Sequence, residues 1–392
     1  MREGWTYKKL GEVADISAGQ GAPQGENNYC SDGIPFIKAG NLESLINGMP
    51  EQTMQKVSDL VAKSHRLKLY KSGSVLFAKS GMSCMKGWVY TLKNDCYVVS
   101  HLAVITPHMQ KTEGRYLNYY FQFNKPNTLV KDAAYPSISL KDIENISIPV
   151  PSLSEQQSIV AELDKINELI SLKKAQLSDL DSLAQSIFYD MFGDPIENEK
   201  GWEVKKLGDI SSVKTGPFGS MLHKDDYISN GIPLVNPIHI KDYRVIADMD
   251  FTISDEKARE LNAYILRKND VIFARRGDIG RCAVISDKEN GYLCGTGSLF
   301  VRFEQEVIPQ YIMYIIRSSS FIKELISKAK GATMLNLNST TIAALGIPLP
   351  PLSLQQEFAK RIELIEQQKA QISSTIKDLE TLLASRMQYW FD

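Results

Sequence analysis

A long internal repeat covers almost all of the 392 residues and sets the architecture that this chain can adopt. The phrase IPVPSLSEQQ at 148–157 returns as IPLPPLSLQQ at 347–356, and GWTYKKLGEV at 4–13 returns as GWEVKKLGDI at 201–210. Two further strings, GIPFI and KSGSVLFAKSG, return as GIPLV and RKNDVIFARRG in the same order. The offset between the copies stays between 196 and 199 residues. Because order and spacing are both kept, we expect two copies of one module.

Each copy has a globular part, at 1–151 in the first copy and at 197–350 in the second. The runs SVLFA, CYVVSHLAVIT and DVIFA are rich in β-branched residues and are separated by Gly, Asn and Pro, which predicts short strands. The strings EGRYLNYYFQF and PQYIMYIIRSSSFIKELISKA predict helices. The globular parts are therefore expected to be α+β.

The second part of each copy predicts one long helix, within 152–196 and within 351–392. Apolar residues recur there at alternating spacings of four and three, without an interrupting Gly or Pro. That period is typical of a coiled coil, and about 40 helical residues span roughly 60 Å. The predicted seam consists of Ile159, Leu163, Ile166, Ile170, Leu177, Leu180, Ile187, Phe358, Ile362, Ile365, Ile372, Ile376, Leu379 and Leu383.

The two seams share one register, which favours pairing of the helices within one chain over self-association or partner binding. Lys173, Lys369 and Arg386 interrupt the seam. They either fix the register of an antiparallel pair or extend their charged ends to its edge, and we expect the second.

The repeated IP.P.LS..QQ phrase predicts a stiff joint between each globular part and its helix. The prolines keep the backbone extended and are expected to end the preceding strand. Ser154 and Ser353 are predicted to cap the helices with their hydroxyl groups. The segment 191–202 would then end the first helix and lead to the second globular part.

Composition and motifs argue against several classes of protein. No apolar run is long enough for a membrane span, and the first residues do not form a leader of the signal-peptide type, so a soluble cytoplasmic protein is expected. The net charge of −1 means that any surface for nucleic acid must be local. A methyltransferase motif of the type [N/D]PP[Y/F/W] and a GxxxxGK phosphate loop are both absent.

Metal and nuclease sites are also weighed and set aside. Asp194 with Glu203 and Lys205 resembles a nuclease set, but Glu203 corresponds to Thr6 in the other copy. Five cysteines form no CxxC pair. The spacing of Cys84 and Cys96 equals that of Cys282 and Cys294, yet no histidines occur at matching positions. Buried small hydrophobic residues are therefore expected, and no metal.

The GW..KKLG openings, the IP.P.LS..QQ joints and the two long helices, in tandem, resemble the specificity subunits of type I restriction–modification systems over essentially the whole chain. The resemblance implies two pseudo-repeat target-recognition domains, separated by long helices that form an antiparallel coiled coil. Each domain would read one half of a bipartite, asymmetric site on double-stranded DNA, and the helices would set the spacing. The subunit would itself be non-catalytic.

The same resemblance implies partners and a role in phage defence. The chain would recruit two adenine methyltransferase subunits, which use S-adenosylmethionine for DNA methylation. Restriction subunits would add an ATP- and Mg-dependent endonuclease in the full complex. Neither the target bases nor the spacer length can be derived from the residues.

Two pairs of loops supply the candidate DNA contacts. The strings FAKSG at 77–81 and FARRG at 273–277 place basic residues after a short apolar strand, where Lys and Arg can reach phosphates or guanine edges. The matching segments 133–142 and 332–341 carry small polar and aromatic groups. The candidates are Lys79, Ser80, Lys86, Tyr135, Ser137, Lys214, Arg275, Arg276, Arg281, Asn336 and Asn338, with Gln20 as a further one.

Each candidate has a plainer alternative. The first pair of loops can be a solvated hairpin with ordinary surface charges, and the second pair can consist of turn and capping residues. A scaffold that binds only proteins is the main rival, and a specificity protein that serves another effector is a second. Salt dependence of DNA binding separates the scaffold from a DNA reader.

Overall fold

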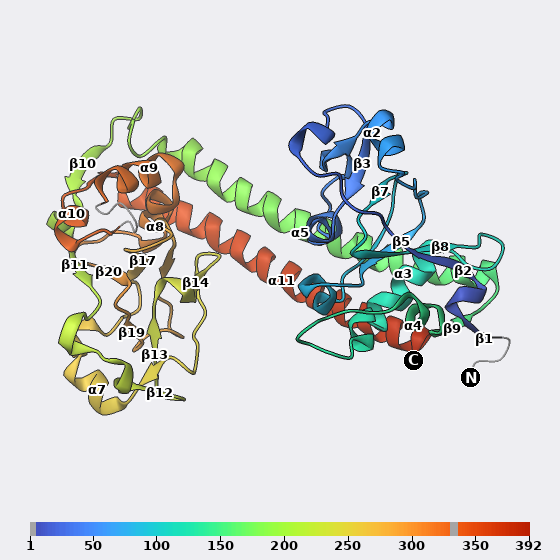
Figure 1. Ribbon diagram of the computed structural model, residues 1–392. Helices are drawn as coiled ribbons and strands as arrows, with labels where there is room; N and C mark the ends of the chain where they lie inside the picture. Colours follow the sequence, from blue (N-terminus) through green and yellow to red (C-terminus); the bar gives the residue numbers. More distant parts are fainter. Residues whose placement is uncertain (1–4, 330–335) are drawn as a thin grey trace. The chain divides into compact units, whose positions relative to one another are not determined.

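The structure is a computed structural model that describes residues 5–329 and 336–392 (Figure 1). The chain forms two compact units, residues 1–174 with 374–392 and residues 175–373. The division falls inside the two long helices, α5 (Leu153–Phe192) and α11 (Leu352–Phe391). Each unit therefore combines one globular part with segments of both helices, and the predicted α+β class is confirmed.

Unit 1 is built on a four-stranded antiparallel sheet in the order β2–β8–β5–β6. A second sheet has the order β4–β3–β7, and in it β3 and β7 run parallel. The strands are β2 (Ala14–Ala18), β3 (Ile34–Ile37), β4 (Lys56–Val57), β5 (Val75–Ala78), β6 (Val89–Thr91), β7 (Tyr97–Val98) and β8 (Leu102–Pro107). The helices of its globular part are α1 (Leu42–Ile46), α2 (Asp59–Ser64), α3 (Gly114–Phe123) and α4 (Leu140–Glu144).

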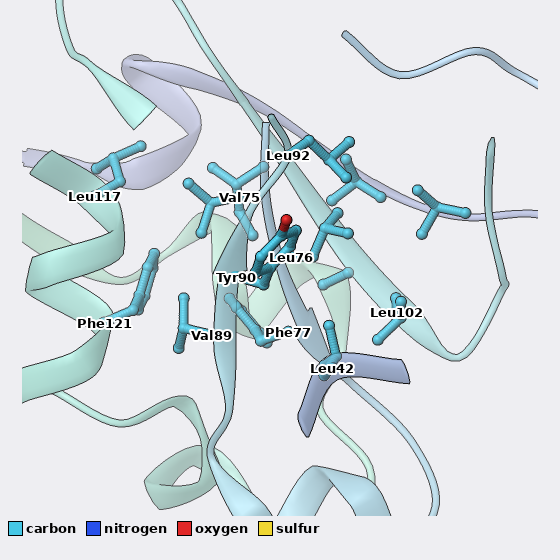
Figure 2. Close-up of a cluster of buried hydrophobic side chains, with 14 of the residues drawn as sticks. Leu42, Val75, Leu76, Phe77, Val89, Tyr90, Leu92, Leu102, Leu117 and Phe121 are labelled. Carbon is cyan, nitrogen blue, oxygen red and sulfur yellow. The ribbon is translucent and has the colours of Figure 1, made fainter. Parts of the chain in front are cut away.

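The core of unit 1 forms where the four-stranded sheet meets α3 (Figure 2). All residues of β5 are buried, because the strand lies inside the sheet and both of its faces are covered. Phe77 of β5 and Phe121 of α3 lie with ring centroids 5.3 Å apart. Burying a side chain of this size contributes roughly 1.5–3 kcal/mol.

Unit 2 repeats this plan, with β11–β20–β17–β18 as the antiparallel sheet and β12–β16–β13–β19 as the second sheet. The strands are β11 (Ser211–Thr215), β12 (Tyr227–Ile228), β13 (Ile232–Val235), β16 (Thr252–Ile253), β17 (Val271–Ala274), β18 (Cys282–Val284), β19 (Leu293–Cys294) and β20 (Ser298–Phe303). Its globular part contains α6 (Leu207–Ile210), α7 (Asp255–Glu260), α8 (Pro309–Arg317), α9 (Ser319–Lys328) and α10 (Ser339–Ala343). A hairpin of β14 (Ile240–Lys241) and β15 (Arg244–Val245) follows β13 where α1 follows β3 in unit 1.

Two predicted elements are interrupted in the structure. The strand expected at 96–106 is β7 and β8 with a turn between them. The helix expected at 309–329 breaks at Ser318, whose hydroxyl accepts a hydrogen bond from the Phe321 amide and caps α9. Ser is favoured at this position because its oxygen satisfies an amide of the first turn.

The repeated opening and the repeated joint are strand partners. In unit 1, β1 (Thr6–Lys9) pairs antiparallel with β9 (Ser147–Val150), and in unit 2, β10 (Glu203–Lys206) pairs with β21 (Gly346–Leu349). Pro149 and Pro348 lie inside their strands, so the prediction that the prolines end the strand is wrong for them, whereas β9 and β21 do end directly before Pro151 and Pro350. A proline is tolerated there because a strand of a two-stranded sheet has one edge without ladder bonds.

The predicted helix caps are wrong as well. Helix α5 begins at Leu153, and the hydroxyl of Ser152 accepts a hydrogen bond from the Glu155 amide at 3.2 Å. Ser154 and Ser353 therefore lie within the first turn of their helices. Before α11 the capping position is occupied by Pro351, which has no side-chain oxygen.

The first glutamine of the QQ pair anchors the helix to the globular part of unit 1. Gln156 is fully buried, and its amide group donates to the carbonyl of Pro151 at 3.0 Å. Its oxygen accepts a hydrogen bond from the Glu113 amide at 3.0 Å, directly before α3. Beside it, the hydroxyl of Tyr116 donates to the carbonyl of Pro149 at 2.9 Å.

Unit 2 has the same arrangement. Gln355 is buried, donates to the carbonyl of Pro350 at 2.8 Å and accepts from the Ile308 amide at 3.1 Å, directly before α8. The hydroxyl of Tyr311 donates to the carbonyl of Pro348 at 2.7 Å. The repeated phrase thus builds a strand, a helix start and a buried clamp in each unit.

The long helices lie antiparallel within each unit. In unit 1, Glu162 of α5 accepts hydrogen bonds from Arg386 and Trp390 of α11, and Lys174 pairs with Glu380 at 2.9 Å. Higher residue numbers on α5 therefore face lower numbers on α11.

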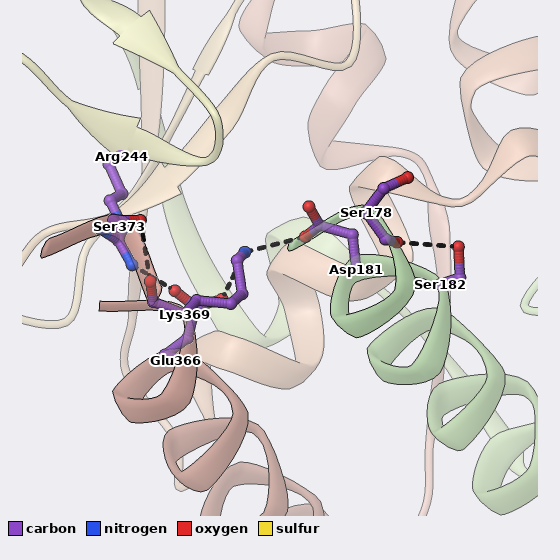
Figure 3. Close-up of polar contacts among 7 residues, drawn as sticks. All are labelled: Ser178, Asp181, Ser182, Arg244, Glu366, Lys369 and Ser373. Carbon is purple, nitrogen blue, oxygen red and sulfur yellow. Dashed lines mark hydrogen bonds and ion pairs between the residues drawn. The ribbon is translucent and has the colours of Figure 1, made fainter. Parts of the chain in front are cut away.

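In unit 2, Lys369 of α11 lies 2.8 Å from Asp181 of α5 and 2.9 Å from Glu366 (Figure 3). Lys369 and Arg386 therefore bind carboxylates of the opposite helix. The expectation that the charged ends extend to the edge is wrong for Lys369, whose side chain is 14% exposed, whereas Arg386 is partly exposed. Their bonds to the opposite helix support the alternative that they fix the register, and for Lys173 the expectation stays a prediction.

The predicted seam is largely buried and shifts by one position near the helix ends. Ile187 is only half-buried, whereas Phe188 and Phe192 are buried, and at the other end Phe391 is buried. The helix ends pack against globular parts, where a wider stripe follows the 3.6 period of a straight helix instead of 3.5. The buried seam residues are Ile159, Leu163, Ile166, Ile170, Phe358, Ile362, Ile365, Ile372 and Ile376, and the half-buried ones are Leu177, Leu180, Leu379 and Leu383.

Candidate nucleic-acid interface

In unit 1 the structure brings the loop after β5 together with the segment before α4. Ser80 and Ser137 form an antiparallel bridge, and the Ile138 amide donates to the carbonyl of Lys79 at 2.8 Å. His101 joins them, because its Nδ1 lies 2.9 Å from the hydroxyl oxygen of Ser80 in a hydrogen bond. Lys79, Ser80 and Ser137 thus form one polar site.

In unit 2 the corresponding loop and segment meet in the same way. Arg276 and Asn336 form an antiparallel bridge, and the Leu337 amide donates to the carbonyl of Arg275 at 2.9 Å. Of the segment 332–341, residues 332–335 lie outside the described part of the chain. The two units therefore carry the same loop pair with different side chains on it.

The two adjacent guanidinium groups concentrate positive charge in unit 2. Arg275 is only 7% exposed, and its Nε donates to the carbonyl of Thr296 at 3.1 Å. Burial, together with the charge of Arg276, lowers the pKa of Arg275 below its usual value. Arg276 is exposed, and within residues 5–329 and 336–392 neither arginine forms an ion pair. Because Arg275 is held inside, Arg276 is the group that can reach a ligand.

The remaining candidates lie apart from these loop pairs or already have structural roles. Arg281 is exposed and bound to Asp278 at 2.7 Å. The side chain of Asn338 accepts a hydrogen bond from the Thr341 amide at 2.7 Å and caps α10, which is the capping alternative. Lys214 is an exposed residue of β11, opposite Phe300.

In unit 1, Tyr135 is 82% exposed next to the loop pair. Lys86 is exposed at the end of a short 3-10 helix, Met82–Lys86, with its ammonium group 5.8 Å from the ring centroid of Trp88. The side chain of Gln20 accepts from the Lys68 amide at 3.1 Å and so has a structural role.

Sequence reasoning missed His101 and Thr296, which support the first loop of each pair. Neither residue lies in a repeated string, and each comes next to its loop only through strand pairing.

The matched glycines Gly19 and Gly216, by contrast, could be found from the repeat. A Cβ atom at Gly19 would lie 2.1 Å from the carbonyl oxygen of Val98, so the chain can approach this closely only without a side chain.

The matched cysteine spacing is coincidental. Strand pairing places Val89 opposite Phe77 in unit 1 and Cys282 opposite Phe273 in unit 2, so Cys84 has no cysteine counterpart. Cys84 and Cys282 are both buried, as predicted. Among the described residues there is no group of three or more His, Cys, Asp or Glu that could hold a metal ion.

Two copies of one α+β domain, each presenting an equivalent loop pair with its own side chains, define a duplicated recognition protein. The sequence model of the family described as "Type I restriction modification DNA specificity domain" matches residues 2–181 and 199–381. The chain belongs to this family, and it is a type I specificity subunit, which is itself non-catalytic.

Similar proteins agree with this assignment. The specificity subunit of the type I restriction enzyme MjaIX of Methanocaldococcus jannaschii is 30% identical over 379 residues, which cover 92% of this chain and 86% of that protein. The EcoKI specificity subunit of Escherichia coli K12 is 22% identical and covers 93% of this chain and 82% of that protein.

The fold is likewise found in solved structures. The S subunit of a type I restriction–modification system from M. genitalium aligns with 99% of this chain and 96% of its own, at a TM-score of 0.56 and 13% identity. A chain from a study of complex assembly and conformational transition in the type I R-M system aligns with 100% of this chain and 98% of its own, at a TM-score of 0.61 and 18% identity. Within the described residues, no helix is both long and apolar enough to cross a membrane.

Proposed function

We propose that each unit reads one half of a bipartite, asymmetric site on double-stranded DNA through its loop pair. The observation that carries this proposal is that Lys79, Ser80 and Ser137 in unit 1 match Arg275, Arg276 and Asn336 in unit 2 by strand pairing but differ in chemistry. Side chains that differ in donor pattern select different base edges, so the two half-sites should differ.

The antiparallel helix segments would set the spacing of the half-sites and, with the globular parts, dock two methyltransferase subunits. This part of the proposal rests on the family. The methyltransferase subunits would use S-adenosylmethionine, and restriction subunits would add ATP- and Mg-dependent cleavage in the cytoplasm.

The test compares Arg276→Ala with Arg281→Ala in the chain assembled with a type I methyltransferase subunit. Arg276 is exposed in the loop pair, whereas Arg281 is exposed but bound to Asp278 outside it. Loss of a base or phosphate contact at Arg276 should weaken DNA binding by about 1–3 kcal/mol or flatten the salt dependence. The Arg281 variant should bind almost as the parent does.

The rival proposal is a scaffold that binds only proteins. It would be favoured by an assembled complex whose DNA affinity is weak, does not vary steeply with ionic strength and is the same in both variants.

A further inference from the structure

A groove follows strand β6 of unit 1, which is an edge strand of the four-stranded sheet. It has a volume of about 1040 Å³. Leu45 and Ile46 of α1 form one wall of the groove, and α3 forms another. Asn167 of α5 also lines the groove. Lys79, Ser80 and Ser137 of the loop pair do not line this groove, whereas Lys86 does.

The backbone of β6 is open toward this edge. The Leu92 amide donates to the carbonyl of Ser74 at 2.9 Å, so the alternation of an antiparallel ladder directs the N–H and C=O groups of Val89 and Thr91 away from β5. Among the described strands β6 pairs only with β5, so no ladder bond reaches its other edge. An open strand edge of this kind is a template for an added extended segment.

The charge of the groove is one-sided. Its described lining residues include Lys86, Lys93, Lys125 and Arg115 but no Asp or Glu. Arg115 pairs with Asp164, whereas the three lysines are exposed and form no ion pair with any described residue. The groove therefore favours an anionic occupant.

In unit 2 a hairpin packs at the corresponding edge strand, and among the described strands it forms no ladder with that strand. The hairpin β14–β15 lies beside β18, the edge strand that corresponds to β6. Its Tyr243 ring lies 3.5 Å from the guanidinium carbon of Arg317, and its Arg244 binds Glu366 at 2.5 Å (Figure 3).

The residues that hold this hairpin have counterparts in the groove of unit 1. Glu366 corresponds to Asn167, 199 positions earlier, and Arg317 corresponds to Gln122, as Tyr311 does to Tyr116. Both counterparts line the groove. In unit 1 helix α1 packs beside the edge strand where the hairpin does in unit 2, and the groove is the space left between α1, β6 and these two counterparts, with a cationic lining.

We propose that this groove binds an extended, acidic segment of a partner protein along the open edge of β6. Three observations favour a polypeptide over nucleic acid: the unpaired strand edge, the apolar wall of Leu45 and Ile46, and the hairpin tip that the counterparts of two groove residues hold in unit 2. A double helix presents its phosphates on a rigid convex rod and cannot reach a strand edge at the base of such a groove.

The test uses the full-length chain and a synthetic peptide with the sequence 236–249, closed by a disulfide between added terminal cysteines. One peptide carries the substitutions K241E and R244E, which make it acidic, and the matched peptide keeps the native residues. Binding is measured by fluorescence anisotropy at low and moderate salt. The chain is compared with Lys93→Glu/Lys125→Glu in the groove and with Lys63→Glu/Lys141→Glu, two exposed lysines elsewhere in unit 1.

The acidic peptide should bind at least about tenfold more tightly than the native one, and the groove variant should lose about tenfold in affinity while the control variant does not. Hydrogen exchange at Val89–Thr91 should slow when the acidic peptide is bound. Equal binding of both peptides, or equal losses in both variants, would overturn the proposal. It would also be overturned if a DNA duplex displaced the peptide and the groove variant lost duplex binding equally, because the site would then belong to nucleic acid. None of these outcomes depends on whether the loop pairs read DNA.

Discussion

Replacing Lys369 by methionine should loosen the helix pair of unit 2 by an amount that the structure allows us to estimate. The ammonium group contacts Asp181 at 2.8 Å and Glu366 at 2.9 Å, and its side chain is only 14% exposed. Methionine keeps the unbranched stem that packs along the seam and removes the charge alone.

The magnitude follows from the exposure of the two carboxylates. Asp181 is 45% exposed and regains water when its partner is lost, so this contact is worth about 0.5–1 kcal/mol. Glu366 keeps Arg244 as a partner when Lys369 is replaced. Losing the contact between Lys369 and Glu366 therefore costs similarly little, and not the roughly 3–5 kcal/mol of a buried charge left without a partner. We expect Lys369→Met to lower the free energy of unfolding by about 1–2 kcal/mol at low salt.

The assay is a double-mutant cycle with Asp181→Asn, followed by urea unfolding and by hydrogen exchange in the helix segments of unit 2. The coupling energy between the two substitutions should be about 0.5–1 kcal/mol and should shrink at high salt. A coupling of zero at low salt would refute the reasoning, since Lys369 would then only cover the seam with its stem and contribute nothing to register.

The other predictions concern the joints and the helix pair of unit 1. Gln156→Leu should cost about 2–4 kcal/mol in urea unfolding, because the Glu113 amide and the Pro151 carbonyl lose a buried partner, whereas Gln157→Leu on the exposed side should cost little. Tyr311→Phe should cost about 1–2 kcal/mol by leaving the Pro348 carbonyl unpaired, and an unchanged urea midpoint would contradict the clamp. The hydrogen bond from Arg386 lowers the pKa of Glu162, so the ionised form stabilises unit 1 above the usual glutamate pKa of about 4.3, and this stability is lost as pH falls through the lowered folded value. Melting temperature measured against pH should therefore fall less steeply on the acid side in Glu162→Gln than in the parent.

Much of the architecture follows from the sequence because the repeat and the seam are long. A period sustained over 40 residues predicts a helix whatever its surroundings, and α5 and α11 begin one residue before the predicted caps Ser154 and Ser353. The loop pairs could also be located, because their strings recur at matching offsets.

The details that failed depend on tertiary contacts. Ser152 caps α5 instead of Ser154, because β9 runs through Pro149 and fixes where the helix begins. Arg275 looked like a contact residue, but strand packing buries it. Lys369 was expected at the edge of the seam because a sequence pattern cannot show that Asp181 lies opposite.

The account's central claim is that two units with unlike loop pairs read two unlike half-sites. Sequencing of N6-methyladenine in DNA from cells that express this chain with a type I methyltransferase subunit tests it most directly. The account predicts one bipartite, asymmetric motif with a modified adenine in each half, and exchange of residues 1–150 for those of another specificity subunit should change one half alone. An unsplit motif, or a change in both halves after that exchange, would contradict it.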